Sequence, residues 1–528
     1  MLFNSYEFLF AFLPVALIGY FAAQRIGPES AITWLVVASL FFYGWWNPDY
    51  LVLLVGSMLV NYGFGRQLSN AHRNGRVRSG RIWLFVGVAL NLLLLGWFKY
   101  ANFAVDTANL VSGTQFHFDR IVLPLAISFF TFQQIAYLVD ARQGITREYR
   151  FMHYALFVTF FPQLIAGPIV HHKEMLPQFM REGALRPHLS NIAIGTTILL
   201  IGLFKKVVLA DSAALYASPV FDAAAGGSAP SFFIAWGGAL AYTLQLYFDF
   251  SGYSDMAIGA ARLFGIRLPV NFHSPYKATS IVEFWRRWHM TLSRFLRDYL
   301  YIPLGGNRGR GFARYRNLMI TMVLGGLWHG AGWTFVAWGA LHGAYLIINH
   351  GWTRWRSRYL AGFHLPAPIG KCLAWSLTFA AIVVGWVFFR ATTFDAALAI
   401  LSGMAGLNGV AIPSAIAARL GDLWPMLEGM GVTSYIGGGS SFVYTWVWIA
   451  LLLPIALWMP NTQQIMVRAE PALNPHVAEQ RDELRAFPWL ERRLRWAPTR
   501  TWAVTIALVG TTGVLALTRV SEFLYFQF

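Results

Sequence analysis

The sequence predicts an all-α integral membrane protein, a polytopic bundle of about 11–12 spanning helices. Hydrophobic residues make up 56% of the 528 residues and charged residues only 12%, whereas a soluble domain carries about 25% charged residues. The mean hydropathy is +0.48, and apolar runs recur along most of the chain. These observations exclude a single soluble globule. They also exclude a disordered chain, which needs low hydrophobicity.

The apolar runs set the expected positions of the spanning helices, each of which needs about 20 mostly apolar residues. The expected spans are residues 7–23, 30–46, 50–64, 82–99, 121–139, 152–169, 190–210, 231–260, 317–349, 371–389, 443–459 and 502–518. The run 317–349 is long enough for a helical hairpin or a broken helix. The first run lacks a basic stretch and a small-residue cleavage site, so we interpret it as a retained span rather than a signal peptide.

Basic residues are concentrated in the short stretches between the apolar runs. The chain has 41 Lys and Arg residues against 24 Asp and Glu residues, a net charge of +17. Cytoplasmic loops of membrane proteins carry such an excess, so we attribute the charge to topology and expect no nucleic-acid partner. The basic stretches are 66–81, 142–150, 262–316, 354–358 and 461–501. Counting spans between them predicts that the N-terminus and the C-terminus both lie on the periplasmic side.

Two places conflict with a simple count of crossings, and both contain histidines. An odd number of apolar runs separates two basic stretches, so we expect the run 152–169 to be re-entrant or half-buried. The run 317–349 must enter the membrane and return. Broken helices at membrane depth are tolerated where they line a protein cavity. Outside the membrane, we expect a glycine-rich outward loop at 405–440 and a short surface helix within 461–501.

The segment 279–301 carries several independent helix signals. Ser280 and Glu283 form a capping box, and apolar residues recur at steps of three and four, the pattern of an amphipathic helix. The oppositely charged pairs at a spacing of four are Glu283–Arg287 and Arg294–Asp298. We expect one basic amphipathic helix at the membrane surface, with His289 on its apolar side.

Two histidines are the candidates for the chemistry. His289 lies beside arginines, and His329 lies within the glycine-rich stretch LGGLWHGAGW. Glycine lets a backbone or ligand approach closely, and an ionisable group in an apolar span is a functional candidate by default. Each also has a structural interpretation, as an interfacial or a packed core histidine. His342 and His350 share the run of His329 without its glycines, and we interpret them as structural.

Other polar residues lie in apolar surroundings. In LQLYFDFSGYSDM these are Gln245, Asp249, Ser251, Tyr253, Ser254 and Asp255, and a second cluster is Ser128, Thr131, Gln133 and Gln134. The first group would form the polar wall of a pocket or a network that fixes the two histidines. The alternative is a helix end with capping side chains.

The motif content excludes several enzyme classes. The chain has one cysteine, Cys372, no H-E-x-x-H zinc motif and no G-x-S-x-G nucleophile elbow. It also lacks the G-x-x-x-x-G-K-[ST] loop that binds nucleotide phosphates. We expect no metal site, and we expect the two histidines to perform general acid–base work on a transferable group.

A set of motifs, in order along nearly the whole chain, resembles the bacterial membrane-bound O-acyltransferases (MBOAT) of the alginate O-acetyltransferase type. The motifs are FKYANF at 98–103, LPLAISFFTFQ at 123–133, FFPQLIAGPIV at 160–170, QLYFDFSGYSDMAIG at 245–259, EFWRRWHMTLSRFLRDYLYIPLGGNR at 283–308, RNLMITMVLGGLWHGAGW at 316–333, PNTQQIM at 460–466 and FLYFQF at 523–528. Each motif is weak alone, but the set is specific. The stretches 405–440 and 470–500 match nothing in the family.

The resemblance implies a single membrane-embedded domain over 1–528, with core motifs at about 98–350 and flanking helices at 1–97 and 351–528. It implies a helical bundle with a central tunnel, in which His329 is the catalytic residue and His289 lies on the cytoplasmic side. The donor would be acetyl-CoA, a substrate rather than a bound cofactor. Transfer would be completed by an SGNH-type periplasmic partner, beside polysaccharide export machinery, at the bacterial inner membrane.

The remaining expectations concern the donor and the acceptor. Donor-binding or tunnel-lining residues are expected to be Arg286, Arg287, Arg294, Trp328, Asn271, Gln245, Asp249, Ser251 and Tyr253. The acceptor stays open among alginate, acetylated cellulose, another exopolysaccharide and peptidoglycan. The alternative function is a membrane transporter or scaffold for acyl groups or glycan without its own catalysis. The sequence of a secondary transporter is expected to contain internal repeats. This sequence shows none, which counts against that alternative.

Overall fold

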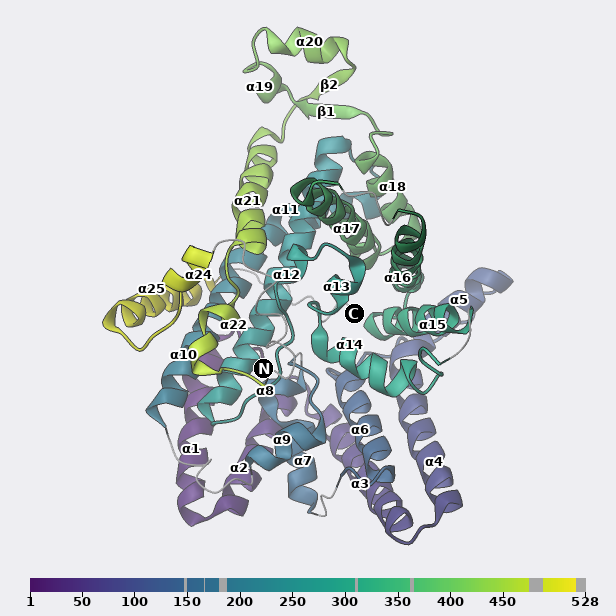
Figure 1. Ribbon diagram of the computed structural model, residues 1–528, viewed down its shortest axis with the longest axis vertical. Helices are drawn as coiled ribbons and strands as arrows, with labels where there is room; N and C mark the ends of the chain where they lie inside the picture. Colours follow the sequence, from purple (N-terminus) through teal and green to yellow (C-terminus); the bar gives the residue numbers. More distant parts are fainter. Residues whose placement is uncertain are drawn as a thin grey trace.

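The computed structural model describes residues 1–146, 150–165, 167–179, 188–308, 312–360, 365–473 and 488–518. Within these residues the structure is almost entirely helical, which confirms the predicted all-α class (Figure 1). The stretches of helix that are long and apolar enough to cross a bilayer by themselves are Glu7–Ile26, Val77–Ser112, Leu189–Ala225, Ala367–Arg390 and Gly439–Trp458. The protein is therefore a multi-pass membrane protein whose outer helices contact lipid, while the full number of spans stays a prediction.

The N-terminal helices form one end of the molecule, the lower end in Figure 1 for α1 to α4 and α6. The bounds are η1 (Glu7–Phe12), α1 (Leu13–Ile26), α2 (Pro28–Gly44), α3 (Asp49–Arg73), α4 (Val77–Leu95), η2 (Gly96–Tyr100), α5 (Ala101–Ser112) and α6 (Ile127–Arg142). The elements η1 and η2 are π-helical turns that continue into the neighbouring α-helices. Most of these helices overlap the expected apolar runs, but α3 continues to Arg73, beyond the expected run 50–64, and α5 lies outside every expected run.

The run 152–169 is broken, as the crossing count predicts. It folds as α7 (Phe151–Thr159) and α8 (Phe161–Leu164), followed by α9 (His172–Phe179). The chain leaves the helical conformation at Phe160, and Pro162 stands in the first turn of α8, where proline is well tolerated. Every side chain from His153 to Ile165 is buried, so the broken segment lies inside protein rather than in lipid. A break leaves backbone groups without helical hydrogen bonds, and such groups are tolerated at membrane depth only inside protein or beside a water-filled cavity.

The helix α12 (Phe232–Leu263) forms the centre of the bundle (Figure 1). It packs against α10, α11, α17, α18 and α21. These neighbours and the π-helical turn between the first two are α10 (Leu189–Phe204), η3 (Lys205–Ala210), α11 (Asp211–Ala225), α17 (Ala367–Arg390), α18 (Phe394–Met404) and α21 (Gly439–Trp458). From Ala239 to Leu263 the side chains of α12 are buried almost without interruption, which is typical of a helix surrounded by protein.

The segment 279–301 is not the continuous surface helix that the sequence predicts. It is divided into α13 (Ile281–Trp285), α14 (Met290–Leu296) and η5 (Arg297–Tyr301), preceded by the turn η4 (Pro275–Lys277). The break lies at His289, whose backbone is left-handed. The predicted N-cap is confirmed, because Ser280 Oγ accepts the amide N–H of Glu283 at 3.2 Å. The segment lies within the bundle (Figure 1), with Phe284, Trp288 and Leu292 buried.

The run 317–349 forms the expected hairpin, from α15 (Phe312–His329) and α16 (Trp333–Tyr359). The two helices approach closely because glycines face one another. A Cβ atom on Gly326 would lie 2.2 Å from the carbonyl oxygen of Phe335, and one on Gly339 would lie 2.4 Å from that of Met322. Both contacts are with main-chain atoms, so a side chain at either position would force the helices apart.

The segments outside the core are short. The glycine-rich 405–440 stretch contains β1 (Val410–Pro413), α19 (Ser414–Ala417), α20 (Leu423–Gly429) and β2 (Val432–Tyr435). The two strands pair in parallel, with Val410 opposite Val432, at the end of the molecule far from α1 (Figure 1). The C-terminal elements are α22 (Thr462–Ile465), η6 (Val467–Ala469), α24 (Pro488–Arg493) and α25 (Arg500–Ala516). The motif FLYFQF at 523–528 lies outside the described residues, and the side on which each terminus lies stays a prediction.

Candidate active site

His329 is the last residue of α15 and borders a cavity of about 80 Å³. This volume exceeds the roughly 30 Å³ share of one water molecule in the liquid. The cavity is lined by Lys99, Leu123, Pro124, Leu125, Ala126, Ile127, Ser128, Phe129, Ile165, Trp328 and His329. His329 itself is 8% exposed. The sequence-predicted catalytic residue therefore lies at the wall of a small, half-open pocket.

Three aromatic rings pack edge-on against the imidazole of His329. The distances between ring centroids are 4.9 Å to Trp328, 5.2 Å to Trp338 and 5.2 Å to Phe389. Such packing restricts the rotation of the imidazole and excludes bulk water from it. Electrostatic interactions in a water-excluded site are stronger than in solution, so a proton-transfer group gains effectiveness there.

His289 lies next to His329, with 6.2 Å between the two ring centroids. Its backbone has φ 42° and ψ 52°, a conformation that few residues other than glycine adopt. Asn271 stabilises this kink, because its carbonyl oxygen accepts the amide N–H of Met290 at 2.9 Å. The kink places the His289 side chain in the interior, where it is fully buried. The structure thus brings the two sequence-predicted histidines together from separate segments.

The side chain of Asn271 also sets the tautomer of His289. Asn271 Oδ1 accepts the hydroxyl and the amide N–H of Thr291, at 2.8 and 3.3 Å, which identifies it as the acceptor for His289 Nδ1–H at 3.1 Å. A neutral imidazole protonated at Nδ1 has its lone pair on Nε2. That Nε2 is buried without a hydrogen-bond partner in the described part of the chain, so it is available to a substrate.

Replacing Asn271 by leucine is expected to reduce acyl transfer by about 100-fold, because His289 and Thr291 lose the side-chain oxygen that accepts hydrogen bonds from both. The measurement is the initial rate of acyl transfer in membranes that contain equal amounts of each variant. Asn271→Asp keeps an acceptor oxygen and is expected to retain more activity than Asn271→Leu. A normal rate for Asn271→Leu would show that the orientation of His289 is irrelevant.

His342 is fully buried in an aromatic surrounding, in agreement with its structural interpretation. The ring of Trp338 contacts both histidines, with distances between ring centroids of 4.8 Å to His342 and 5.2 Å to His329. The other rings against His342 are those of Phe284, Trp285, Tyr345 and Trp386. His342 therefore supports the wall that holds His329.

Two of the predicted donor-binding arginines differ in exposure. Arg286 is exposed. Arg287 is 2% exposed and forms an ion pair with Glu283, which confirms that predicted pair. Of these two, Arg286 is the one whose guanidinium can reach a soluble anion.

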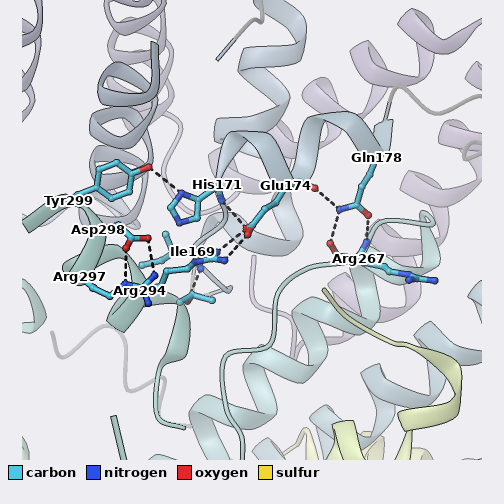
Figure 2. A network of polar contacts seen from close by, with 10 residues as sticks. Ile169, His171, Glu174, Gln178, Arg267, Arg294, Arg297, Asp298 and Tyr299 are labelled. Atoms are coloured by element: carbon cyan, nitrogen blue, oxygen red, sulfur yellow. Dashed lines mark hydrogen bonds and ion pairs between the residues drawn. The ribbon is translucent and has the colours of Figure 1, made fainter. Parts of the chain in front are cut away.

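Arg294 is held by a carboxylate from another segment. Its two terminal nitrogens donate to Glu174, at 2.6 and 2.8 Å (Figure 2). The predicted pair Arg294–Asp298 is wrong, because the Asp298 carboxylate binds Arg297 at 2.7 Å. Bidentate pairing with a carboxylate is a strong and directional interaction, so Arg294 joins α14 to α9.

A second set of hydrogen bonds, centred on Tyr299, lies near this ion pair. The Tyr299 hydroxyl lies 3.1 Å from His171 Nδ1 (Figure 2). It donates to Asp140 at 2.9 Å. Burial, reinforced by the charge of Arg294, lowers the pKa of His171 to about 4. His171 is therefore neutral near pH 7, and its Nδ1–H donates to the Tyr299 oxygen. The broken segment and η5 are thus joined to α6.

Replacing Glu174 by glutamine is expected to lower the free energy of unfolding by about 1–3 kcal/mol, because the Arg294 guanidinium loses a charged partner. Both side chains are mostly buried, with 20% and 16% exposed. The measurement is thermal unfolding in detergent. The outer pair Arg267–Glu470, in which Glu470 is 74% exposed, supplies the control: Glu470→Gln is expected to change stability by less. Equal effects would contradict a structural role for the inner pair.

Comparison with known proteins identifies the fold family of this site. The model of the membrane-bound O-acyltransferase (MBOAT) family matches residues 83–386, more than half of the chain. The chain belongs to the MBOAT family. The match includes both histidines, every residue that lines the cavity, and the broken segment. The family resemblance seen in the sequence motifs is confirmed.

Individual MBOAT relatives cover most of the chain. It is 48% identical over 439 residues to a peptidoglycan O-acetyltransferase of Helicobacter pylori, covering 78% of this chain and 81% of the relative. It is 44% identical over 403 residues to a probable alginate O-acetylase, AlgI, of Pseudomonas aeruginosa, covering 75% and 73%. A teichoic acid D-alanyltransferase of Streptococcus thermophilus is 29% identical over 295 residues, covering 53% and 70%.

These matches establish the general activity. The chain is an O-acyltransferase, and the alternative of a transporter or scaffold without catalysis gives way to this assignment. The relatives' names share acyl transfer to a polysaccharide, and the alginate-type branch of the MBOAT family is supported. The matches do not identify the acyl donor or a partner protein.

The predicted polar wall on α12 does not face the cavity beside His329. Asp249 forms an ion pair with Lys206 at 2.5 Å, and Lys206 also binds Asp211 at 2.7 Å. Lys205 pairs with Asp255 at 2.8 Å. Gln245, Ser251 and Tyr253 are buried on the same helix, and the cavity lining contains residues from other elements instead. This network connects η3 to α12 of the MBOAT bundle.

Lys99 is a site residue that the sequence analysis passed over. It is 7% exposed and lines the cavity beside His329, together with Ser128 and Trp328. The sequence did contain a signal for Lys99, because a lysine inside an apolar span is a functional candidate by default.

Within the described residues, no group of three or more His, Cys, Asp or Glu side chains is placed to hold a metal ion.

Proposed function

We propose that this acyltransferase moves an acetyl group from cytoplasmic acetyl-CoA toward hydroxyl groups of a polysaccharide outside the inner membrane. The observation that carries the proposal is the position of His329 at a small, half-open pocket, with 6.2 Å between its ring centroid and that of His289. Two relatives are named as O-acetylating enzymes, which supports the choice of acetyl.

The proposed step is general-base catalysis of acyl transfer. The neutral imidazole of His329 takes the proton of an acceptor hydroxyl while the hydroxyl oxygen attacks the thioester carbonyl carbon. The carbon–sulfur bond then breaks, and a proton returns to the thiolate, giving free CoA and the new ester. His289, whose Nε2 carries a lone pair, orients the donor or relays to the thiolate the proton that His329 has taken. An acyl-histidine relay uses the same residues in two steps.

Donor binding is proposed for the cytoplasmic side of the bundle. CoA carries several phosphates, and arginine recognises phosphate through paired hydrogen bonds. Arg286 is the exposed candidate, close in sequence to His289. Arg287 and Arg294 are neutralised by their ion pairs with Glu283 and Glu174, so they would position neighbouring segments rather than bind the phosphates.

The acceptor is proposed to be an exported or cell-wall polysaccharide. Relatives are named for peptidoglycan and for alginate, and cellulose or another exopolysaccharide is chemically equivalent as a source of hydroxyls. Because the chain lacks a serine-hydrolase motif, we propose that an SGNH-type periplasmic partner completes transfer beside the export machinery. Both chain termini are proposed to lie on that side.

The test is donor turnover by the purified protein in detergent, with acetyl-CoA and detection of released thiol. Propionyl-CoA and palmitoyl-CoA serve as controls for acyl size. The proposal expects release from acetyl-CoA that decreases steeply with chain length. Faster release from the long-chain donor would contradict the acetyl assignment. If no donor turns over, adding the acceptor and the SGNH-type protein must restore release, and failure to do so would overturn the donor.

A further inference from the structure

The helix that carries His329 ends inside the protein, where its last carbonyl groups need partners. The last four carbonyls of an α-helix have no acceptor role inside the helix. In α15 these belong to residues 326–329. The first of them accepts the amide N–H of Gly330 at 3.3 Å. The other three point toward the neighbouring turn η2.

Two consecutive side chains of η2 bind these three carbonyl oxygens. The Tyr100 hydroxyl donates to the carbonyl of Leu327 at 2.8 Å. Lys99 Nζ donates to the carbonyl of Trp328 and to that of His329, the latter at 3.4 Å. A cation near a helix C-terminus also interacts favourably with the negative end of the helix dipole. We call Lys99 and Tyr100 the helix-end clamp.

The donors of Lys99 are fully used by the protein. An ammonium group has three N–H donors, and the third is directed to Ser128 Oγ at 3.2 Å. Lys99 lies in the membrane-spanning stretch Val77–Ser112, where a charged side chain is costly unless carbonyls or counter-charges surround it. These bonds indicate that the lysine acts on the helix end and not on a substrate.

Two of the three residues between His329 and α16 are glycines, which have no side chains to fix the position of the His329 backbone. Gly330 and Gly332 form the turn to α16, with Gly332 N bonded to Gly330 O at 3.0 Å. A Cβ atom on Gly330 would lie 2.1 Å from the ring of Phe335, so this position has no room for an anchoring side chain. The clamp therefore fixes the main chain at the residue whose ring performs the chemistry.

We propose that Lys99 is a positioning residue for His329, acting through the main-chain carbonyls at the end of α15, with Tyr100 in support. The inference rests on the proposed role of His329 in catalysis. It adds that the catalytic geometry depends on a buried cation from a different span. Lys99 holds the histidine in place and takes no proton in the reaction.

The experiment compares the full-length wild-type protein with Lys99→Met, which keeps most of the length of the side chain and removes all three of its donors. Hydrogen exchange of peptides that contain residues 327–333 reports directly on the helix end. Exchange there is expected to be about 10–100-fold faster, because the carbonyls lose a charged donor, while α12 is unchanged. In the acetyl-CoA assay, kcat is expected to fall by about 10–100-fold with KM within about twofold of wild type.

Two further variants complete the design. Tyr100→Phe removes one hydroxyl and is expected to shift exchange and kcat in the same direction by smaller factors; it decides the question if Lys99→Met fails to fold. Lys371→Met replaces an exposed lysine on α17 and is expected to match wild type in both measurements.

The two readouts separate the clamp from the proposed donor. Faster exchange together with lower kcat supports the proposal. Lower kcat with unchanged exchange at 327–333 overturns it, because Lys99 would then act on substrate directly. Unchanged values of both also overturn it. If the wild type shows no turnover of acetyl-CoA even with the acceptor and the SGNH-type protein present, while Lys99→Met still exchanges faster, the clamp is supported and the donor assignment fails.

Discussion

His329→Ala is expected to abolish acetylation of the polysaccharide while the folded protein remains in the membrane. Removing a general base typically costs about 10²–10⁴-fold in rate, which would place residual activity below detection in cells. The imidazole is packed by Trp328, Trp338 and Phe389, and these rings stay in place around the vacated space. The measurement is the ester content of the extracted polysaccharide from cells that express equal amounts of protein.

The matched control for this prediction is His117→Ala. The side chain of His117 is 95% exposed, and His117 is not among the residues that line the cavity beside His329. Its replacement is expected to leave acetylation unchanged. Normal acetylation by His329→Ala would contradict the catalytic assignment, whatever the control shows.

Gly326→Ala is expected to have the second largest effect, through the packing of α15 on α16. The added Cβ atom would lie 2.2 Å from the carbonyl oxygen of Phe335. Because that atom belongs to the main chain, it cannot rotate away, and the two helices must separate. Overpacking of this kind costs about 1–3 kcal/mol or more, and His329 would move with the end of α15. We expect a lower unfolding temperature and at least a tenfold loss of activity.

Gly351→Ala is the control for Gly326→Ala on the same helical hairpin. Gly351 lies in α16 and has no atom within 4 Å of the position of an added Cβ. Alanine is a better helix former than glycine, so this variant is expected to be as stable as wild type or more so. A Gly326→Ala protein with wild-type stability and activity would show that the close approach of the helices is not required.

The sequence was sufficient for most helices because membrane spans are long apolar runs, and length is a robust signal. The hairpin of α15 and α16 and the broken run that contains Phe160 both follow from counting crossings. The parallel strands β1 and β2 were missed, because each has four residues inside a glycine-rich stretch without strand periodicity. Whether such short strands form depends on tertiary contacts, which the local sequence pattern does not contain.

The site was only partly predictable for the same reason. The types and positions of His289 and His329 marked them as candidates, but their proximity depends on a kink that no helix signal predicts. The left-handed backbone at His289 exists because Asn271 binds the residues that follow it. Asp249 was expected to line a tunnel, whereas a lysine brought into place by the π-helical turn η3 pairs with it.

The most direct test of the central claim follows radiolabelled acetyl groups in inverted membrane vesicles, whose cytoplasmic face is outward. Acetyl-CoA is added outside, and ester-linked label is measured on acceptor polysaccharide and partner protein enclosed within. With the wild-type chain, label is expected inside, and with His329→Ala it is expected to be absent. Equal amounts of enclosed label with the two proteins would contradict transfer of the acetyl group at His329.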